Sequence, residues 1–381
     1  MSGERLGRAG DGGTWLPPFV DAHVHLGLVD PVAVRRGGIA VVHDLGWVPD
    51  VARTWPGTPG FPEVAYAGAF LTAPGGYPSD RTWAPRGAVE GVASPEEAVA
   101  AVDRQVAAGA SFVKVALHSE AGPVPDDVTL AALVGHAHAR GRDVVAHVEG
   151  RGMAARAFEA GVDRFAHAPF TERLPDDLLA AMVRPRDGHP GPHRSADDRL
   201  APEHDSARDR TRGWRRYELD NDTNVVFGGP GMSWVSTFDV HGWGRATAPQ
   251  DVAIDNVRRF VALGGTVVYG TDLGNGPLPP GVNARELRAL AAAGLDAHAL
   301  VAALTHDAAA ERCVPGRALR PGTQQSSANA APATWVPGDP PDLDDPDAVA
   351  AWLACAVVER GNGRDPAVCA DRETAPPEGR P

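Results

Sequence analysis

The sequence predicts an α/β protein whose main domain is a TIM-type (β/α)8 barrel carrying a small, reduced β-sandwich-like appendage. Between residues 19 and 310, apolar runs of strand length alternate with amphipathic stretches rich in alanine and leucine. Eight such runs are present, which is the number of strands that closes this kind of barrel. The predicted strands are Phe19–His25, Ile39–Leu45, Glu63–Leu71, Phe112–Leu117, Asp143–Val148, Arg164–Ala168, Ser233–Val240 and Thr266–Asp272.

The stretches between these strands carry helix start and stop signals. Ser94 can cap a helix that begins at Pro95, and Glu97 stands where a capping box places its carboxylate. Gly109 then ends that helix. The same order of helix, glycine and strand recurs further on, at Gly141, Gly161, Gly264 and Gly265. This repetition is typical of successive βα units.

One long stretch interrupts the pattern. Residues 184–222 are rich in charge and in proline, glycine and serine, which predicts a disordered insertion. The insertion follows the predicted helix Pro175–Val183 and precedes a strand. Helix-to-strand connections lie at the barrel face opposite the catalytic loops, so we do not expect it to cover the active site.

The ends of the chain differ in composition from the barrel at 19–310. We expect residues 1–18 and 311–363 to form the reduced β appendage, mainly from the C-terminal segment, because two short strand-like pieces lie there. They are Ala333–Val336 and Ala356–Glu359. Residues 364–381 are expected to be a disordered tail.

Composition narrows the class of protein. The chain has 381 residues, 43% of them hydrophobic, and a net charge of −13 without a basic patch, which argues against nucleic acids and anionic membranes as partners. Its three cysteines form no C-x-x-C pair, and no apolar run has the length of a membrane span. We therefore expect a soluble, cytoplasmic protein with a small-molecule substrate. Homo-oligomerisation stays open.

Two histidines end the first predicted strand. Because side chains alternate along a strand, His23 and His25 share one face while Val24 points to the other. An isolated H-x-H pair is a weak indication of metal binding. Its weight depends on what the other strands contribute.

Four more apolar runs end in residues that bind metals or carry protons. These residues are Lys114, His147, His167 and Asp272. The C-terminal ends of barrel strands converge on one face, so all six side chains are expected around one centre. Histidine and carboxylate suit zinc, manganese or iron.

The lysine in this set has two interpretations. Lys114 could be buried by snorkelling or by pairing with Glu120. Its amine could instead react with carbon dioxide, giving a carbamate whose two oxygens would bridge a pair of metal ions. The second interpretation turns a cation into an anionic ligand.

Taken together, these strand ends resemble the amidohydrolase superfamily of metal-dependent hydrolases. The motifs that carry the resemblance are Val20-Asp21-Ala22-His23-Val24-His25, Phe112-Val113-Lys114-Val115, Val145-Ala146-His147, Phe165-Ala166-His167-Ala168 and Tyr269-Gly270-Thr271-Asp272. The stretch 71–76 also resembles the Gly-Gly loop of imidazolonepropionase-like and prolidase-like members, where histidine often follows and Tyr77 stands here. Most members have several sandwich strands before the H-x-H, whereas eighteen residues precede Phe19.

The resemblance implies a role for each candidate. His23, His25 and Asp272 would bind the more buried of two Zn2+ ions, with Mn2+ or Fe2+ as alternatives. Carboxylated Lys114 would bridge the ions, and the other ion would be bound by two further histidines, His147 and His167. Asp272 would also be the catalytic group, taking a proton from the attacking water and passing it to the leaving group.

Several polar residues near the expected site are weaker candidates. Tyr77, His118 and His241 could contact substrate, although their spacing is not diagnostic. His43 and Asp44 end the second strand and are expected to support the ligands. Two histidines on a predicted amphipathic helix, His136 and His138, are expected at the outer surface.

These observations favour a metal-dependent hydrolase that cleaves a non-peptide, often cyclic, C–N bond or a small acylated amino acid or dipeptide. A mononuclear deaminase of heterocyclic amines would use the same histidines and Asp272 but leave Lys114 uncarboxylated. A catalytically inactive barrel used for interaction is the alternative from another class.

Overall fold

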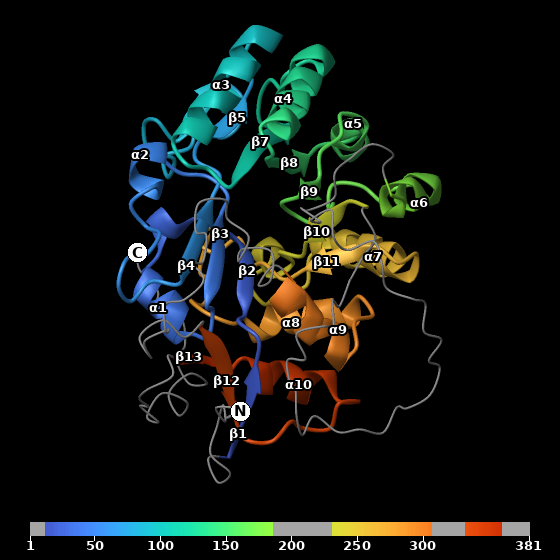
Figure 1. Cartoon of the computed structure of the whole chain (residues 1–381). Helices are drawn as coiled ribbons and strands as arrows, with labels where there is room; N and C mark the ends of the chain where they lie inside the picture. Colours follow the sequence, from blue (N-terminus) through green and yellow to red (C-terminus); the bar gives the residue numbers. More distant parts are fainter. Residues whose placement is uncertain (1–11, 186–230, 307–331, 360–381) are drawn as a thin grey trace, which may run out of the picture.

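The structure is a computed structural model that describes residues 12–185, 231–306 and 332–359 (Figure 1). These residues form the predicted barrel of parallel strands. In order around the barrel, the strands are β2 (Val20–Val24), β3 (Val41–Asp44), β4 (Glu63–Tyr66) with β5 (Phe70–Thr72), β7 (Phe112–His118), β8 (Asp143–Glu149), β9 (Arg164–Phe165), β10 (Ser233–Val235) and β11 (Thr266–Val268).

Backbone hydrogen bonds close the barrel where the strand ladders stop. The Ala22 amide donates to the Tyr269 carbonyl at 3.0 Å, and the His25 amide donates to the Leu273 carbonyl at 2.7 Å, joining β2 to the segment after β11. At the other seam the Ser111 amide donates to the Tyr66 carbonyl at 2.8 Å. The strands therefore form a ring whose C-terminal ends meet at one face.

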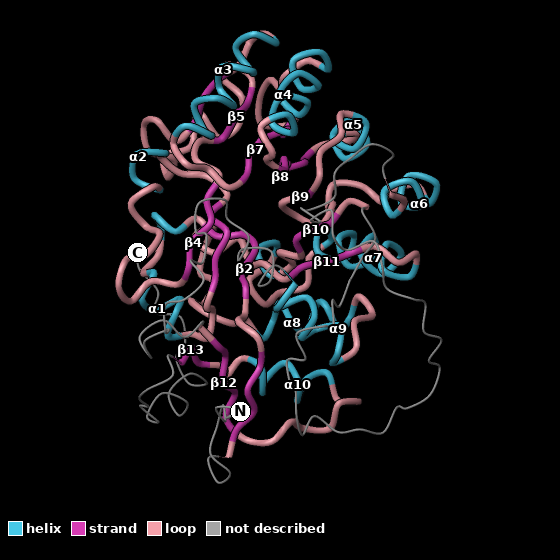
Figure 2. The backbone as a smooth tube through the Cα atoms, viewed as in Figure 1, coloured by secondary structure: helices cyan, strands magenta, loops and turns pink. Residues whose placement is uncertain are grey.

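Helices surround the strands, as Figures 1 and 2 show. Their bounds are α1 (Pro31–Arg36), α2 (Pro49–Ala52), α3 (Pro95–Ala107), α4 (Asp127–Ala139), α5 (Met153–Glu159), α6 (Asp176–Val183), α7 (Ala248–Ala262), α8 (Ala284–Ala292), α9 (Ala297–Thr305) and α10 (Pro346–Leu353). The helices pack against the strands through their apolar faces. For example, Trp234 of β10 stacks on Phe260 of α7, with ring centroids 3.9 Å apart. This contact fixes strand seven against its helix.

The start and stop signals of α3 are confirmed. The Ser94 hydroxyl accepts a hydrogen bond from the Glu97 amide at 3.3 Å, and the Glu97 carboxylate accepts one from the Ala93 amide at 2.8 Å. Gly109 follows the helix with a φ of +90°, a backbone conformation that glycine adopts without steric cost.

The third predicted strand, Glu63–Leu71, is broken into β4 and β5. Gly68, with a φ of +76°, turns the backbone out of the extended conformation. The next amide, that of Ala69, donates to the Gln105 side-chain oxygen at 2.9 Å instead of to a neighbouring strand. The prediction of one continuous strand was therefore wrong.

The last three barrel strands are shorter than predicted. β9 ends at Phe165, β10 at Val235 and β11 at Val268. The segments after β10 and β11 each leave the extended conformation at a residue with positive φ, namely Thr237 at 48° and Asp272 at 57°. Both residues belong to the site described below.

A short strand that the sequence did not predict follows the third barrel strand. β6 (Val89–Gly91) pairs in parallel with β5. Parallel pairing requires the intervening loop, residues 73–88, to return to the start of the strand. This loop lies beside the C-terminal ends of the barrel strands, where it supplies residues to the site.

A separate antiparallel sheet has the strand order β1 (Gly13–Leu16), β12 (Ala333–Pro337) and β13 (Val357–Glu359). The two strand-like pieces near the C-terminus thus both form strands, whereas β1 was not predicted. The Phe19 amide donates to the Thr334 hydroxyl at 3.0 Å, linking this sheet to the first barrel strand.

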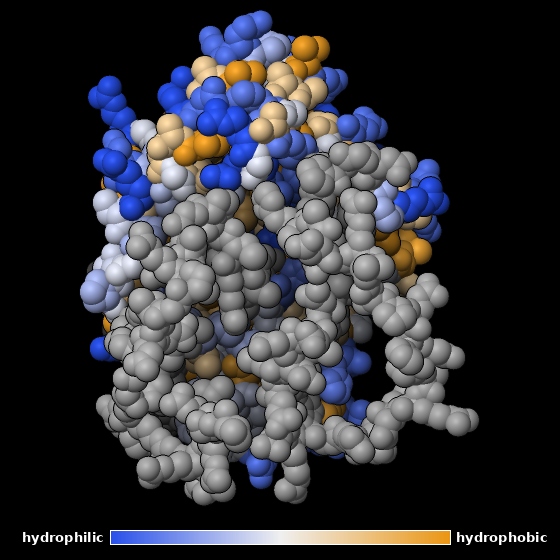
Figure 3. All heavy atoms as spheres, in the orientation of Figure 1, coloured by the Kyte–Doolittle hydropathy of each residue, from blue (hydrophilic) through white to orange (hydrophobic). Residues whose placement is uncertain are grey.

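The surface facing the viewer in Figure 3 mixes hydrophilic and apolar residues over the upper helices. No helix in the described ranges is both long enough and apolar enough to cross a membrane. The predicted insertion, from residue 186 onward, and the predicted tail at 364–381 lie outside the described residues.

Candidate metal centre

The six side chains predicted to bind metal all line one cavity of about 450 Å³ at the C-terminal ends of the barrel strands. They are His23, His25, Lys114, His147, His167 and Asp272, and each is less than 8% exposed. Such burial is unusual for charged and polar side chains without a binding partner. The cavity is therefore the centre on which the predicted ligands converge.

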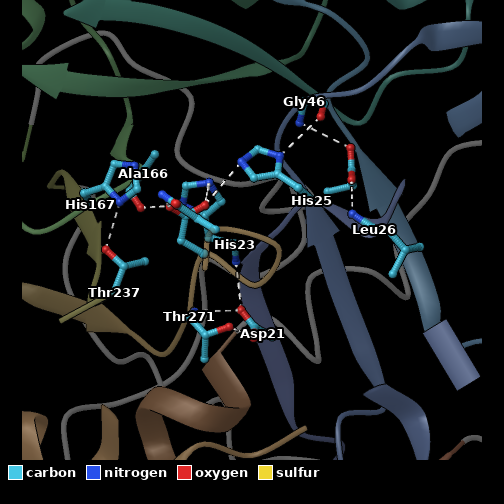
Figure 4. Close-up of polar contacts among 12 residues, drawn as sticks. Asp21, His23, His25, Leu26, Gly46, Ala166, His167, Thr237 and Thr271 are labelled. Atoms are coloured by element: carbon cyan, nitrogen blue, oxygen red, sulfur yellow. Dashed lines mark hydrogen bonds and ion pairs between the residues drawn. The ribbon is translucent and has the colours of Figure 1, made fainter. Parts of the chain in front are cut away.

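Three of these residues form a tight group. The Nε2 atoms of His23 and His25 each lie 3.2 Å from Oδ1 of Asp272. The other ring nitrogens are occupied: Nδ1 of His23 lies 2.8 Å from the Ala166 carbonyl oxygen, and Nδ1 of His25 lies 3.2 Å from the Gly46 carbonyl oxygen (Figure 4). Because a carbonyl only accepts, both rings carry their proton on Nδ1 and leave Nε2 free to bind a cation.

Two atoms of this group indicate that a cation fits between them. Nε2 of His23 and Oδ1 of Asp272 are buried and have no hydrogen-bond partner among the described residues. Burial holds the pKa of His23 well below its usual value, so its imidazole is neutral. Burial acts to raise the pKa of Asp272, but the neighbouring histidines outweigh it and hold that pKa well below the usual range. A neutral imidazole and a carboxylate are the metal-binding forms of these side chains.

Lys114 lies in the middle of β7, and its Nζ atom is buried without a hydrogen-bond partner among the described residues. Glu120, the pairing partner considered from the sequence, is exposed, and no ion pair joins the two. Burial lowers the pKa of Lys114 to about 7. Near neutral pH a large share of this amine is therefore uncharged.

The two remaining histidines differ in their contacts. Nδ1 of His167 lies 2.9 Å from the Thr237 hydroxyl, as Figure 4 shows, so this ring is held by a neighbour just as those of His23 and His25 are. Nε2 of His147 instead lies 3.1 Å from a carboxylate oxygen of Glu149. The two rings meet edge to face, with centroids 4.9 Å apart.

Asp21 fixes the first and last strands around the ligands. Its Oδ1 accepts hydrogen bonds from the amides of His23 (3.1 Å) and Thr271 (3.0 Å), and its Oδ2 accepts one from the Thr271 hydroxyl. Burial raises the pKa of Asp21 to about 7. Asp21 is thus the link between the H-x-H strand and the residue that precedes Asp272.

Asp44, expected to support the ligands, contacts the backbone around the predicted ligand His25. Its carboxylate accepts hydrogen bonds from the amides of Leu26 at 2.8 Å and Gly46 at 3.2 Å, and these residues flank or hold His25. The ring of its neighbour His43 lies 4.9 Å from that of Phe112, outside the cavity lining.

Asp272 adopts a backbone conformation that non-glycine residues seldom adopt. Such strain persists where the surroundings fix it and is common at functional sites. Here the Asn275 side-chain amide donates to Oδ2 of Asp272 at 2.9 Å. The conformation aims Oδ1 at His23 and His25 while Oδ2 is held by this donor.

The three weaker candidates lie at or beside the cavity. Tyr77 and His241 line it, and the Tyr77 ring stacks on that of His147 at 5.0 Å. His118 is not among the lining residues, but its Nε2 lies 3.2 Å from Glu149. All three are therefore near the predicted ligands.

Glu149, Trp83 and Phe170 also line the cavity, and none was predicted. A signal for Glu149 was available, because His147-x-Glu149 repeats the i, i+2 spacing of His23-x-His25 on a strand. Trp83 and Phe170 lie in loops, whose conformation the sequence pattern does not determine.

Two histidines lie away from the site, as expected. His136 and His138, on α4, contact Asp103 at 2.9 Å and Asp163 at 2.8 Å.

A second buried polar network lies under the loop that follows β10 and was not predicted. The Glu286 carboxylate accepts hydrogen bonds from the amides of Phe238 (2.9 Å) and Asp239 (2.8 Å), while Asp239 pairs with Arg285. This network holds the loop that carries His241 to the cavity.

No protein-family model matches the chain, and no curated protein is found with a matching sequence. Solved structures do match. A Xaa-Pro dipeptidase with bound methionine has 18% identity and a TM-score of 0.58, with 90% of this chain and 86% of that one covered. A. niger ochratoxinase has 19% identity and a TM-score of 0.60, with 91% and 82% covered. A molinate hydrolase has 15% identity and a TM-score of 0.57, with 92% and 82% covered.

At these identities the similarity is one of architecture, and it extends over nearly the whole length of each chain. The chain therefore has the barrel fold of these solved hydrolase structures, which also include one named as an amidohydrolase.

Proposed function

We propose that this protein is a metal-dependent hydrolase that cleaves a C–N bond outside ordinary peptides, in a cyclic amide or in a small acylated amino acid or dipeptide. The observation that carries the proposal is the convergence of six buried ligand-type side chains on one cavity. The similar structures named for a dipeptidase, an ochratoxinase, a molinate hydrolase and a phenylurea hydrolase support the reaction class.

The residues present suit a binuclear centre. His23, His25 and Asp272 would hold one divalent ion, and His147 and His167 would hold the other. Lys114 would bridge them as a carbamate, which its buried Nζ without a hydrogen-bond partner supports. Zinc is the expected metal, with manganese or iron as alternatives.

Bound divalent ions would supply Lewis acidity and activate water near neutral pH. The Asp272 carboxylate would accept the proton of the attacking water and return it to the leaving nitrogen. Asn275 would hold Oδ2 of Asp272 in place. The aromatic walls formed by Phe70, Trp83 and Phe170 would bind the apolar part of the substrate and limit access of bulk water.

The proposal is tested by assaying zinc-loaded protein, prepared in bicarbonate buffer, on matched amides, carbamates, lactones and aminated heterocycles. Turnover of amides or carbamates is the expected result. Ammonia release from the heterocycles by protein holding one ion would point to a deaminase instead. Absence of turnover across the panel with metal bound would contradict an enzymatic role.

A further inference from the structure

A carboxylate that the proposed ligand set does not use lies in the wall of the cavity. Glu149 is the last residue of β8, two positions after His147, so both side chains lie on the same face of the strand. Its side chain is 24% exposed, whereas those of His118 and His147 are 11% and 9% exposed. Glu149 is thus the most accessible member of this group.

The neighbouring strand holds this carboxylate in place. His118 is paired with Glu149 in the register of β7 and β8, and its Nε2 lies 3.2 Å from Oε2 of Glu149. Nε2 of His147 lies 3.1 Å from the same oxygen. If Nε2 of His147 binds a metal ion, Oε2 of Glu149 loses its contact with His147 and keeps the one with His118. A carboxylate oxygen inside the cavity then becomes available to another donor.

Apart from Lys114, no described residue that lines the cavity offers a cationic side chain to pair with a substrate anion. Among the described residues that line it, none is an arginine and the one lysine is Lys114, which the proposed function assigns to the ions. Arg81 is not among the lining residues: its guanidinium carbon lies 5.4 Å from the Tyr77 ring centroid, and its Nε lies 3.4 Å from Oδ1 of Asp80.

Aromatic rings complete the surroundings of Glu149. Tyr77 lies edge to face with His118 at 5.0 Å and with Trp83 at 6.4 Å, and Phe170 lines the same cavity. Aromatic faces attract cations, and a carboxylate among them attracts the cation more strongly.

We propose that Glu149 binds a positively charged amine of the substrate, so that the enzyme prefers substrates carrying an ammonium group near the scissile bond over those carrying a carboxylate. His118 is a positioning residue that orients Glu149. This inference rests on the proposed function, because it assumes that His147 binds metal.

The test measures binding separately from turnover. Zinc-loaded wild type and E149Q are titrated calorimetrically with three probes of similar size and different charge: phenethylamine, phenethyl alcohol and 3-phenylpropionate. A charge-assisted hydrogen bond of this kind predicts about tenfold weaker binding of phenethylamine to E149Q. Binding of the alcohol should be unchanged, and binding of the carboxylate should be unchanged or tighter.

H136Q is the matched control, because His136 also contacts a carboxylate but lies on α4, away from the cavity. It should bind all three probes like wild type. E149D, which keeps the charge, should recover part of the amine binding. Zinc content and melting temperature are measured on each variant.

Equal loss of all three probes in E149Q, or no loss of phenethylamine, would overturn the assignment. Loss of a zinc ion from E149Q would also overturn it, because Glu149 would then belong to the metal ligands. Absence of hydrolysis by wild type that binds phenethylamine through Glu149 would instead contradict the proposed function and leave the amine site standing.

Discussion

The carboxylate of Asp21 and the hydroxyl of Thr271 form a buried hydrogen bond of 2.6 Å between residues that are 250 positions apart in the chain. The bond lies at the closure of the barrel, between the first strand and the segment that follows the eighth. Each partner is close in sequence to a proposed ligand, His23 on one side and Asp272 on the other. The contact that closes the barrel therefore also holds the backbone next to two of the proposed ligands.

Replacing Asp21 with alanine should destabilise the fold strongly. The change leaves the amides of His23 and Thr271 and one hydroxyl buried without their acceptor, which predicts a loss of about 3 kcal/mol in the free energy of unfolding. Asp21→Asn keeps an acceptor in place and should lose less. Urea denaturation monitored by circular dichroism measures both, and equal stability of D21A and wild type would refute the role given to Asp21.

Replacing Asp272 with asparagine should separate metal binding from catalysis. The amide keeps one oxygen ligand but cannot accept a proton, so much of the metal should remain while kcat falls by about a thousandfold. Elemental analysis and steady-state kinetics on the same preparation provide the two readouts. Near-normal kcat in D272N would remove Asp272 from the proposed mechanism.

Replacing Lys114 with alanine should remove most of the second ion. A carbamate cannot form without the amine, and the alanine leaves space in the cavity wall. Added acetate or propionate should restore part of the metal content by supplying the missing carboxylate. If K114A holds as many ions as wild type, the carbamate bridge is wrong.

Because Glu286 is buried, the free energy of unfolding should depend on pH through a group that lies away from the proposed metal ligands. Burial raises the pKa of this carboxyl from its ordinary value of 4.5 to about 8, although hydrogen bonds from the amides of Phe238 and Asp239 oppose the shift. Between these two values the folded protein keeps a proton that the unfolded chain has released. Stability should therefore fall as pH rises from about 4.5 to about 8, by a few kcal/mol in total.

Glu286→Gln should flatten that slope, because the amide does not titrate. The difference between the two proteins is measured by urea denaturation at pH 5, 6, 7 and 8. Asp21 titrates in the same direction, so the comparison with wild type isolates the contribution of Glu286. Parallel stability curves for E286Q and wild type would show that Glu286 is ionised in the fold throughout this range.

The sequence predicted the barrel because apolar periodicity and the glycines that recur at helix ends are local signals. The same signals placed His23 and His147 near strand ends, and an α/β barrel brings strand ends together whatever the loops do. Agreement is therefore best where a residue's position follows from the strand that carries it.

The features that were missed depend on contacts between segments that are far apart in the sequence. Gly68 breaks the third strand because the Gln105 side chain, from α3, takes over the next amide. Glu286, on α8, contacts Asp239 and Phe238 in the loop after β10, which are 47 and 48 positions away in the sequence. No local sequence pattern indicates that contact. Trp83 enters the cavity from a loop whose course the sequence does not determine.

We propose that one cavity holds a binuclear metal centre built from six residues of the barrel strands and of the segments that follow them. Elemental analysis of wild-type protein, purified without added metal and then supplied with zinc and bicarbonate, tests it most directly. We expect about two ions per chain. A chain that binds no ion under these conditions, while remaining folded, would contradict it.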